Sequence, residues 1–210
     1  MGAKAWFVAY FDSDPKAVLA GRPQLDPNAS RALAERLFPK TGLVQIDDGS
    51  LSDLCPRKRH LHVGSFGDLR IVAHQELSSK DKVSQIDRRW FDPSLGRTAY
   101  VHATHSVVDW FAFGLWRDGK LVRSLSVTSE NGVIEQLGEP LAFEAPYWAG
   151  QHSIEDESYP LPFHPLDLSE ASLLEHLGFQ FEGRREDWVC DPDSIALAHY
   201  TVKRPFWQFW

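Results

Sequence analysis

Ionisable side chains lie within the most apolar run of the chain, between Val101 and Val127. Imidazole and carboxylate groups can move protons near neutral pH, and a guanidinium binds carboxylates and phosphates. Such residues could serve a small hydrolase that brings them together in one cleft. The candidate catalytic residues are His105, Asp109 and Arg123, with either Glu135 or His164.

A second pair of histidines, His60 and His62, has the spacing that places both side chains on one face of a strand. Metal-dependent hydrolases use this spacing, but they also need a third ligand and a base, which the sequence does not identify. His102 and His105 are three residues apart and face opposite sides of a strand, so they cannot hold one ion together. We expect His60 and His62 to be partly buried and bonded to the backbone, with a metal site as the alternative, and we predict no cofactor.

Other signatures of catalysis are missing or incomplete. The sequence contains no G-x-S-x-G, P-loop, G-x-G-x-x-G or H-E-x-x-H motif. The stretch F-D-S-D-P superficially resembles the strand-D-x-D loop of haloacid-dehalogenase-like phosphatases, but Pro15 favours Asp14 as a helix cap. Cys55 stands beside the run R-K-R, whose charges could lower the pKa of its thiol, yet this run is equally typical of a surface loop.

Arg123 needs a polar partner inside the protein, because burying an unpaired guanidinium costs a large free energy. Asp118 and Gly119 predict a two-residue hairpin turn of type I′, which would place Arg123 beside Gly114 on an otherwise apolar face. An internal ion pair is favoured over a clamp for a ligand carboxylate. The candidate acids are Asp109, Glu135 and Glu144.

Residues 138–167 form a long irregular connection rich in proline and aromatic residues. Prolines withhold backbone donors, and loops of this length often carry function. Rigid aromatic rings in such a loop can line a pocket or contact a partner. The candidate ligand-binding residues are Tyr147, Trp148 and Phe163. The alternative is that the connection lies back on the sheet and its rings complete the core.

β-branched and aromatic residues predict strands that are separated mostly by short turns. The strands are expected at 5–11, 43–46, 60–66, 69–75, 98–108, 110–117, 121–128 and 196–202. Helical spacing of apolar residues predicts helices at about 27–38, 79–91 and 167–178, and four Asp-Pro pairs open helices or turns. The fold class is therefore α+β, a mainly antiparallel sheet with about three helices on one side, in a single domain of residues 1–210.

Composition limits the partners. The formal charge of −7 opposes binding to a phosphate backbone, so nucleic acid is not an expected partner. No stretch approaches the roughly 18 consecutive apolar residues of a membrane span, and the apolar N-terminal run is interpreted as a first strand and not as a signal peptide. The two cysteines, Cys55 and Cys190, are far apart, which suits a reducing compartment. We expect a soluble cytoplasmic protein that does not contact membranes.

Three long segments resemble a family of uncharacterised proteins found mainly in actinobacteria and their relatives. They are H-A-T-H-S-V-V-D-W-F with the hairpin that follows it, F-E-A-P-Y-W-A-G, and Y-P-L-P-F-H-P-L. With the opening M-G-A-K, the similarity spans most of residues 1–180. The resemblance implies a bacterial cytoplasmic protein, and it brings no activity, cofactor or catalytic residue with it.

These observations favour a binding or interaction protein over an enzyme, since a long aromatic connection is visible and a complete catalytic set is not. Its partner would be an unknown small molecule or a protein, and a small hydrolase, with or without a metal, is the alternative. The aromatic tail of residues 205–210, P-F-W-Q-F-W, carries too much apolar area to stay in water without cost. It should dock on its own chain or join two chains, so the protein is expected to be a monomer or a homodimer.

Overall fold

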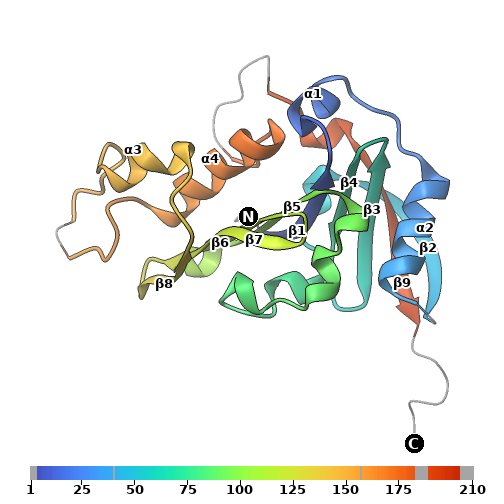
Figure 1. The fold of residues 1–210 in the computed structure, drawn as a ribbon, viewed down its shortest axis with the longest axis horizontal. Helices are drawn as coiled ribbons and strands as arrows, with labels where there is room; N and C mark the ends of the chain where they lie inside the picture. Colours follow the sequence, from blue (N-terminus) through green and yellow to red (C-terminus); the bar gives the residue numbers. More distant parts are fainter. Residues whose placement is uncertain (1–3, 40, 157, 183–188, 204–210) are drawn as a thin grey trace, which may run out of the picture.

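A computed structural model describes residues 4–39, 41–156, 158–182 and 189–203 of the chain. They contain one antiparallel sheet of nine strands, in the order β2-β9-β3-β4-β1-β5-β6-β7-β8 (Figure 1). The strands are β1 Lys4–Phe11, β2 Gly42–Ser50, β3 His60–Phe66, β4 Leu69–Ala73, β5 Thr98–His105, β6 Trp110–Arg117, β7 Lys120–Thr128, β8 Gly132–Leu137 and β9 Ala196–Lys203. The predicted α+β class with a mainly antiparallel sheet is confirmed.

The strand from the far end of the sequence, β9, is inserted between β2 and β3. In this register His62 lies opposite His199, and Val63 lies opposite Ala198. The insertion places the end of the described chain next to the loop that precedes β3. Two pockets lie in this region, one on each face of the sheet.

Aspartate-proline pairs begin the helices as predicted. The side chain of Asp14 accepts the backbone N–H of Lys16 at the start of α1 (Pro15–Ala20), and Asp26 caps α2 (Pro27–Leu37) in the same way. Asp92 and Asp191 open short 3-10 turns. The remaining helices are α3 (Ala145–Trp148) and α4 (Pro165–Leu177), and α4 ends at Gly178 in the left-handed conformation.

Both faces of the sheet are apolar and both are covered (Figure 1). Alternating residues of the central strands, such as Phe7 and Val8, belong to different core clusters. The first cluster includes residues from α1, α3 and α4, while the second includes Leu33 and Leu37 of α2. The prediction that the helices lie on one side is therefore wrong, because a sheet that is apolar on both faces needs cover on both.

The predicted helix at 79–91 is also wrong. This segment forms two 3-10 turns, Val83–Gln85 and Arg88–Phe91. Ile86 between them has extended backbone, and the side chain of Asp87 accepts the N–H of Arg89 and starts a new turn. The apolar side chains still face the core, but local capping interrupts the continuous helix that their spacing predicts.

A β-bulge changes the register of the hairpin formed by β6 and β7. Asp118 and Gly119 have positive φ angles of 47° and 72°, as a type I′ turn requires. Trp116 pairs with Leu121 as predicted, but Leu115 pairs with Arg123, so Val122 is the extra residue. The predicted pairing of Arg123 with Gly114 is therefore wrong, and the side chain of Arg123 moves to the other face of the sheet.

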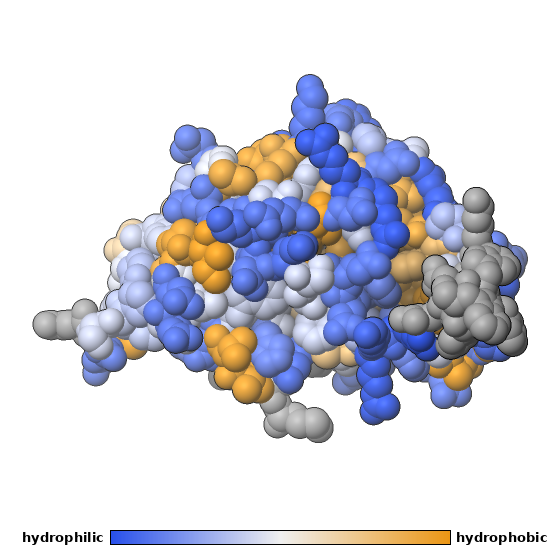
Figure 2. All heavy atoms as spheres, turned by 90° about the horizontal axis from the view of Figure 1, so that it is seen from below, coloured by the Kyte–Doolittle hydropathy of each residue, from blue (hydrophilic) through white to orange (hydrophobic). Residues whose placement is uncertain are grey.

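The exposed large apolar side chains of the described residues lie on edge strands, on the bulge and on one hairpin tip. They are Val44, Ile46, Val107, Val108, Val122, Val133 and Leu137. Figure 2 shows separate apolar patches among hydrophilic side chains on one face of the molecule. No helix in the described ranges is long and apolar enough to cross a membrane. The aromatic tail of residues 205–210 lies outside the described residues.

Candidate functional site

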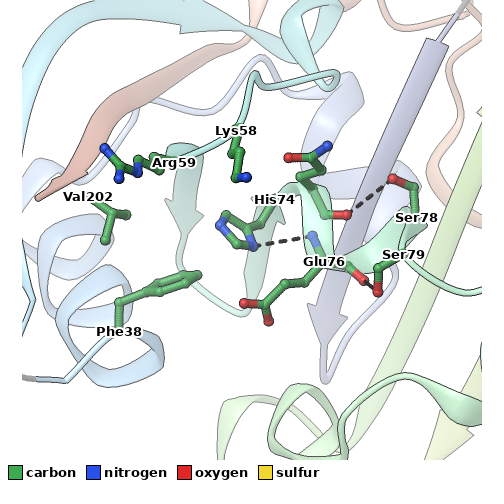
Figure 3. A pocket seen from close by; sticks show the side chains of 9 residues that line it. Phe38, Lys58, Arg59, His74, Glu76, Ser78, Ser79 and Val202 are labelled. Atoms are coloured by element: carbon green, nitrogen blue, oxygen red, sulfur yellow. Dashed lines mark hydrogen bonds between the residues drawn. The ribbon is translucent and has the colours of Figure 1, made fainter. Parts of the chain in front are cut away.

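A pocket of about 430 Å³ opens beside the ends of α2, β4 and β9. We call it the His74 pocket. It is lined by Phe38, Lys58, Arg59, His74, Gln75, Glu76, Ser78, Ser79 and Val202 (Figure 3). Its volume falls within the range of small-molecule sites, which is about 300–1,000 Å³.

His74 lies at the centre of this pocket, directly after β4. Its Nδ1 accepts the backbone N–H of Glu76 at 3.4 Å, so its ring proton is on Nε2. Burial lowers the pKa of His74, and the nearby charge of Arg89 acts in the same direction, whereas Glu76 raises it. The imidazole is therefore neutral near pH 7 and can offer an Nε2–H donor.

Aromatic rings hold His74 in place. Its ring centroid is 4.7 Å from that of Phe38 in an edge-on contact and 6.0 Å from that of Trp90 in a stacked one. The guanidinium carbon of Arg89 lies 5.3 Å from the ring centroids of Phe38 and Trp90, and Arg89 forms an ion pair with Glu76. The one carboxylate that lines the described pocket is thus already paired with a cation.

Lys58 and Arg59 line the side of the pocket opposite Phe38. In Figure 3 the two cations lie above His74, and Phe38 lies below it. The backbone positions them: Arg59 has a φ of 68°, and its carbonyl accepts the N–H of Val202 at 2.8 Å. Neither cation forms an ion pair within the part of the chain that the structure describes. The pocket therefore carries excess positive charge in a protein whose net charge is −7.

The hydroxyls of the pocket do not form a nucleophile–base pair. Ser78 donates to the carbonyl of Gln75 at 3.1 Å, and Ser79 donates to the carbonyl of Glu76 at 2.7 Å. The basic nitrogen of His74 is occupied by a backbone N–H. An imidazole in this state can donate a hydrogen bond to a ligand, but it cannot take a proton from a serine.

Arg123, a candidate catalytic residue, lies inside the protein away from this pocket. It forms a fully buried ion pair with Glu144, with Nε at 2.9 Å from Oε1 and Nη2 at 2.5 Å from Oε2. Its Nη1 also donates to the carbonyls of Leu137 and Gly138. The predicted internal ion pair is confirmed, with Glu144 as the acid.

Glu135 lies on the opposite face of the sheet from Arg123. Its carboxylate accepts hydrogen bonds from the backbone N–H of Ser84 at 3.1 Å and from the hydroxyls of Ser84 and Ser124. Ser124 follows Arg123 in β7, so their side chains point to opposite faces. Glu135 thus anchors the 3-10 turns to the sheet, separately from the ion pair of Arg123.

Asp109 and His164 meet at one end of the sheet. His164 Nε2 lies 3.8 Å from Asp109 Oδ1, and Ser129 donates to Asp109 Oδ2 at 3.2 Å. His164 Nδ1 accepts the N–H of Leu166 and caps α4, so this nitrogen is not available as a base. His105, at the end of β5, has a buried Nδ1 without a hydrogen-bond partner among the described residues.

The candidate catalytic residues therefore occupy three places, and His105, which pairs with Trp110, belongs to the same end of the sheet as Asp109. Asp109 is far from Arg123 along the sheet. The residue after Asp109, Trp110, pairs with Thr128, and Thr128 is five residues along β7 from Arg123. Five residues of a strand span about 17 Å, which exceeds hydrogen-bond reach by far. The structure brings Asp109 and His164 together and leaves Arg123 and Glu135 apart from them and from each other.

Two of the three candidate ligand-binding aromatics pack inward, while Tyr147 also lines a pocket of about 490 Å³. Phe163 is fully buried, and the ring of Trp148 lies edge-on to it with centroids 4.9 Å apart. Trp148 Nε1 donates to Glu144 at 3.2 Å, and Tyr147 stacks on His152 with centroids 4.1 Å apart. The connection 138–167 is thus tied to the core through both its rings and Glu144.

His60 and His62 meet a third histidine that the sequence did not connect to them, His199 on β9. His60 Nδ1 lies 2.8 Å from His199 Nε2, and the ring centroids of His62 and His199 are 4.2 Å apart. Burial, together with the charge that His199 would carry, lowers the pKa of His62 to about 4. These histidines line a pocket of about 320 Å³, which we call the three-histidine pocket; its other residues are Ser52, Asp53, Cys55, Pro56 and Arg57.

Within the described ranges, no three side chains of His, Cys, Asp or Glu converge as a ready metal-binding group. Burial raises the pKa of Cys55, although Lys4 lowers it, so the thiol is not an activated nucleophile. The charges of the R-K-R run do not lower this pKa, and two residues of that run, Lys58 and Arg59, line the His74 pocket instead.

Sequence reasoning missed the residues of the His74 pocket. The R-K-R run was visible, but nothing in the sequence shows that it faces His74, which is a single histidine after a strand. Phe38 and Val202 join the site from segments far away in the chain. A signal existed in the run of three cations within an acidic protein, since such a local excess often marks an anion site.

Comparison with known proteins identifies a family. A model of a family of unknown function (DUF6928) matches residues 5–200. This agrees with the resemblance to an uncharacterised family. No curated protein and no solved structure matches the chain.

Proposed function

Since the chain belongs to DUF6928, a family of unknown function, we propose from its own geometry that it binds a small organic anion in the His74 pocket. The observation that supports this most strongly is the charge pattern of the pocket. Lys58 and Arg59 face it without an ion-pair partner among the described residues, while the carboxylate of Glu76 is paired with Arg89. An anionic ligand would neutralise this excess charge.

The expected ligand also has an apolar or aromatic body. Phe38 and Val202 contribute apolar surface to the pocket, and the Nε2–H of His74 offers a neutral donor between them and the cations. A carboxylate or a phosphate could bond to Lys58 and Arg59 while its ring packs against Phe38. This combination of apolar wall and a few placed donors is typical of small-molecule sites.

A binding role is favoured over a catalytic one. The pocket holds no serine bonded to a histidine, and the residues that a hydrolase would need lie in three separate places. The proposal includes a location in the bacterial cytoplasm. The absence of a disulfide between Cys55 and Cys190 agrees with such a reducing compartment. The connection 138–167 is less suited as the contact surface, because Phe163 is buried and Trp148 packs on it.

Isothermal titration calorimetry with benzoate and phenyl phosphate tests the proposal, because both probes join one anionic group to one ring. We expect saturable binding to the unmodified protein, and binding at least about tenfold weaker in the double variant Lys58→Gln, Arg59→Gln, which corresponds to about 1.4 kcal/mol. Glutamine keeps a polar side chain that can form hydrogen bonds, although a shorter one, while removing both charges.

A matched control is the double variant Arg117→Gln, Lys120→Gln at the β6–β7 turn, which removes the same two charges from outside the His74 pocket. It should bind like the unmodified protein. Absence of saturable binding for both probes, or equal weakening in the two double variants, would contradict a specific anion site in this pocket.

A further inference from the structure

The His74 pocket lies where β9 ends. Val202, the second-last residue of this strand, lines the pocket, and its N–H is held by the carbonyl of Arg59 at 2.8 Å. Lys203 pairs with Gly42, the first residue of β2, so the ladder between β2 and β9 stops at this pair. The chain after Lys203 therefore starts from the rim of the His74 pocket.

The sequence continues from this point with R-P-F-W-Q-F-W, residues 204–210. Pro205 has no backbone donor, which disfavours a continued strand. Leaving four aromatic rings in water costs free energy, and burial against apolar surface recovers it. An extended chain spans about 3.3–3.6 Å per residue, so seven residues reach at most about 23–25 Å. Every ring of this segment is therefore within reach of a pocket that begins at Val202.

We propose that aromatic rings of residues 206–210 dock in the His74 pocket of their own chain and compete there with the organic anion. This inference rests on the proposed function, because it concerns the regulation of the same pocket. Phe38 and Val202 give the rings an apolar wall to pack against. The Nε2–H of His74 offers a donor to a ring face or to a carbonyl of the docked segment.

Lys58 and Arg59 favour an aromatic occupant. Neither forms an ion pair within the described ranges, and a cation is attracted to the face of a ring, most strongly to that of tryptophan. The wall of the pocket already contains one such contact, because the guanidinium carbon of Arg89 lies 5.3 Å from the ring centroid of Phe38. Residues 205–210 contain two tryptophans and no acid. An anionic ligand, which neutralises the two cations directly, can therefore displace them.

A second apolar surface beside β9 is less suited to the rings. Val44 and Ile46 of β2 are 40% and 45% exposed. Val44 pairs with Thr201, so its side chain lies on the opposite face of the sheet from that of Val202. The residue after Ile46 is Asp47, and an acid gains nothing beside the negative face of a ring. This surface offers apolar contact without the cations.

Acetylation of Lys58 by N-hydroxysuccinimide acetate, followed by mass spectrometry, measures the docking without an anionic ligand. The test variant of the full chain carries Phe206→Ser, Trp207→Ser, Phe209→Ser and Trp210→Ser. We expect Lys58 to react about tenfold faster in it, which corresponds to an occupancy of about nine-tenths in the unmodified protein. Val44→Ser, Ile46→Ser is the matched control and should react like the unmodified protein. Lys120, which is exposed outside the His74 pocket, should react equally in all three proteins if the fold is retained.

Calorimetry with phenyl phosphate then tests the competition, and the test variant should bind about tenfold more tightly than the unmodified protein. Equal Lys58 rates in these two proteins, or equal affinities, would overturn the inference and leave the anion site standing. Protection of Lys58 that disappears on dilution would also overturn it, because the rings would then come from a second copy. If neither protein binds the probe while the rings still protect Lys58, the proposed function fails and the docking stands.

Discussion

Arg123 and Glu144 form an ion pair with both side chains fully buried, and this pair links the central hairpin to the connection 138–167. The carboxylate of Glu144 also accepts the N–H of Leu141 and the indole N–H of Trp148. These donors to the Glu144 carboxylate come from β7 and from the connection itself. The long proline-rich segment is held to the sheet by electrostatics as well as by its aromatic rings.

Glu144→Gln should destabilise the protein strongly, because it leaves the guanidinium of Arg123 buried without a counter-charge. Removing one partner of a buried pair costs about 3–5 kcal/mol. Urea unfolding followed by circular dichroism measures this change. The matched control is Glu35→Gln, which breaks the exposed pair between Arg31 and Glu35 on α2 and should cost about 0.3–0.5 kcal/mol. Similar losses in both variants would show that the buried pair contributes no more than a surface pair.

Gly138→Ala should destabilise the same region through a steric clash. Gly138 has a φ of 74°, and a Cβ added there would lie 2.0 Å from the carbonyl oxygen of Val122, the bulge residue. Gly67 has a similar φ of 66°, but an added Cβ meets nothing within 4 Å. Gly67→Ala should therefore cost only the backbone strain, about 1–2 kcal/mol, and Gly138→Ala should cost a further 1–3 kcal/mol or so from overpacking. Equal melting temperatures for the two variants would contradict the close approach of Gly138 to β7.

Lowering the pH from 7.5 to 5 should destabilise the protein. Burial, and then the nearby His176, lowers the pKa of His102 to about 3, while histidines of the unfolded chain titrate near 6.5. Below pH 6.5 the unfolded state therefore binds more protons than the folded state, and the free energy of unfolding falls as the pH falls. The contribution of His102 to the free energy of unfolding continues to fall until about pH 3.

Urea unfolding at pH 7.5 and pH 5 measures this effect, since carboxylates titrate mostly below this window. One buried histidine accounts for about 2 kcal/mol of the loss between these pH values, at 1.36 kcal/mol per pH unit below 6.5. His102→Gln retains polar atoms that can face Tyr100 and Ser169 but does not titrate, so its loss should be smaller by about this amount. An identical pH dependence in the variant would contradict a neutral, buried His102.

Local signals in the sequence were sufficient for most of the fold. The strands at 60–66 and 110–117 have the predicted bounds, and the four Asp-Pro pairs cap helices or turns as expected. These features depend on side chains that act on the backbone within a few residues. The strand β8, Gly132–Leu137, was missed because it is an edge strand with polar residues and begins with a glycine.

The rest depends on contacts between distant segments. The bulge at Val122 changes which face Arg123 occupies, and turn chemistry alone does not reveal it. His199 meets His60 across 139 residues because β9 is inserted beside β3, an arrangement without a local signature. The His74 pocket is likewise assembled from four segments, so its charge excess becomes visible only once they are brought together.

The most direct test of the anion-binding account is a crystal structure of the unmodified protein with phenyl phosphate at saturating concentration. The account predicts the phosphate within hydrogen-bond distance of Lys58 and Arg59, with His74 Nε2 donating to the ligand and the phenyl ring against Phe38. If calorimetry establishes binding in solution but the crystal structure shows the ligand elsewhere and only water in the His74 pocket, the account is contradicted.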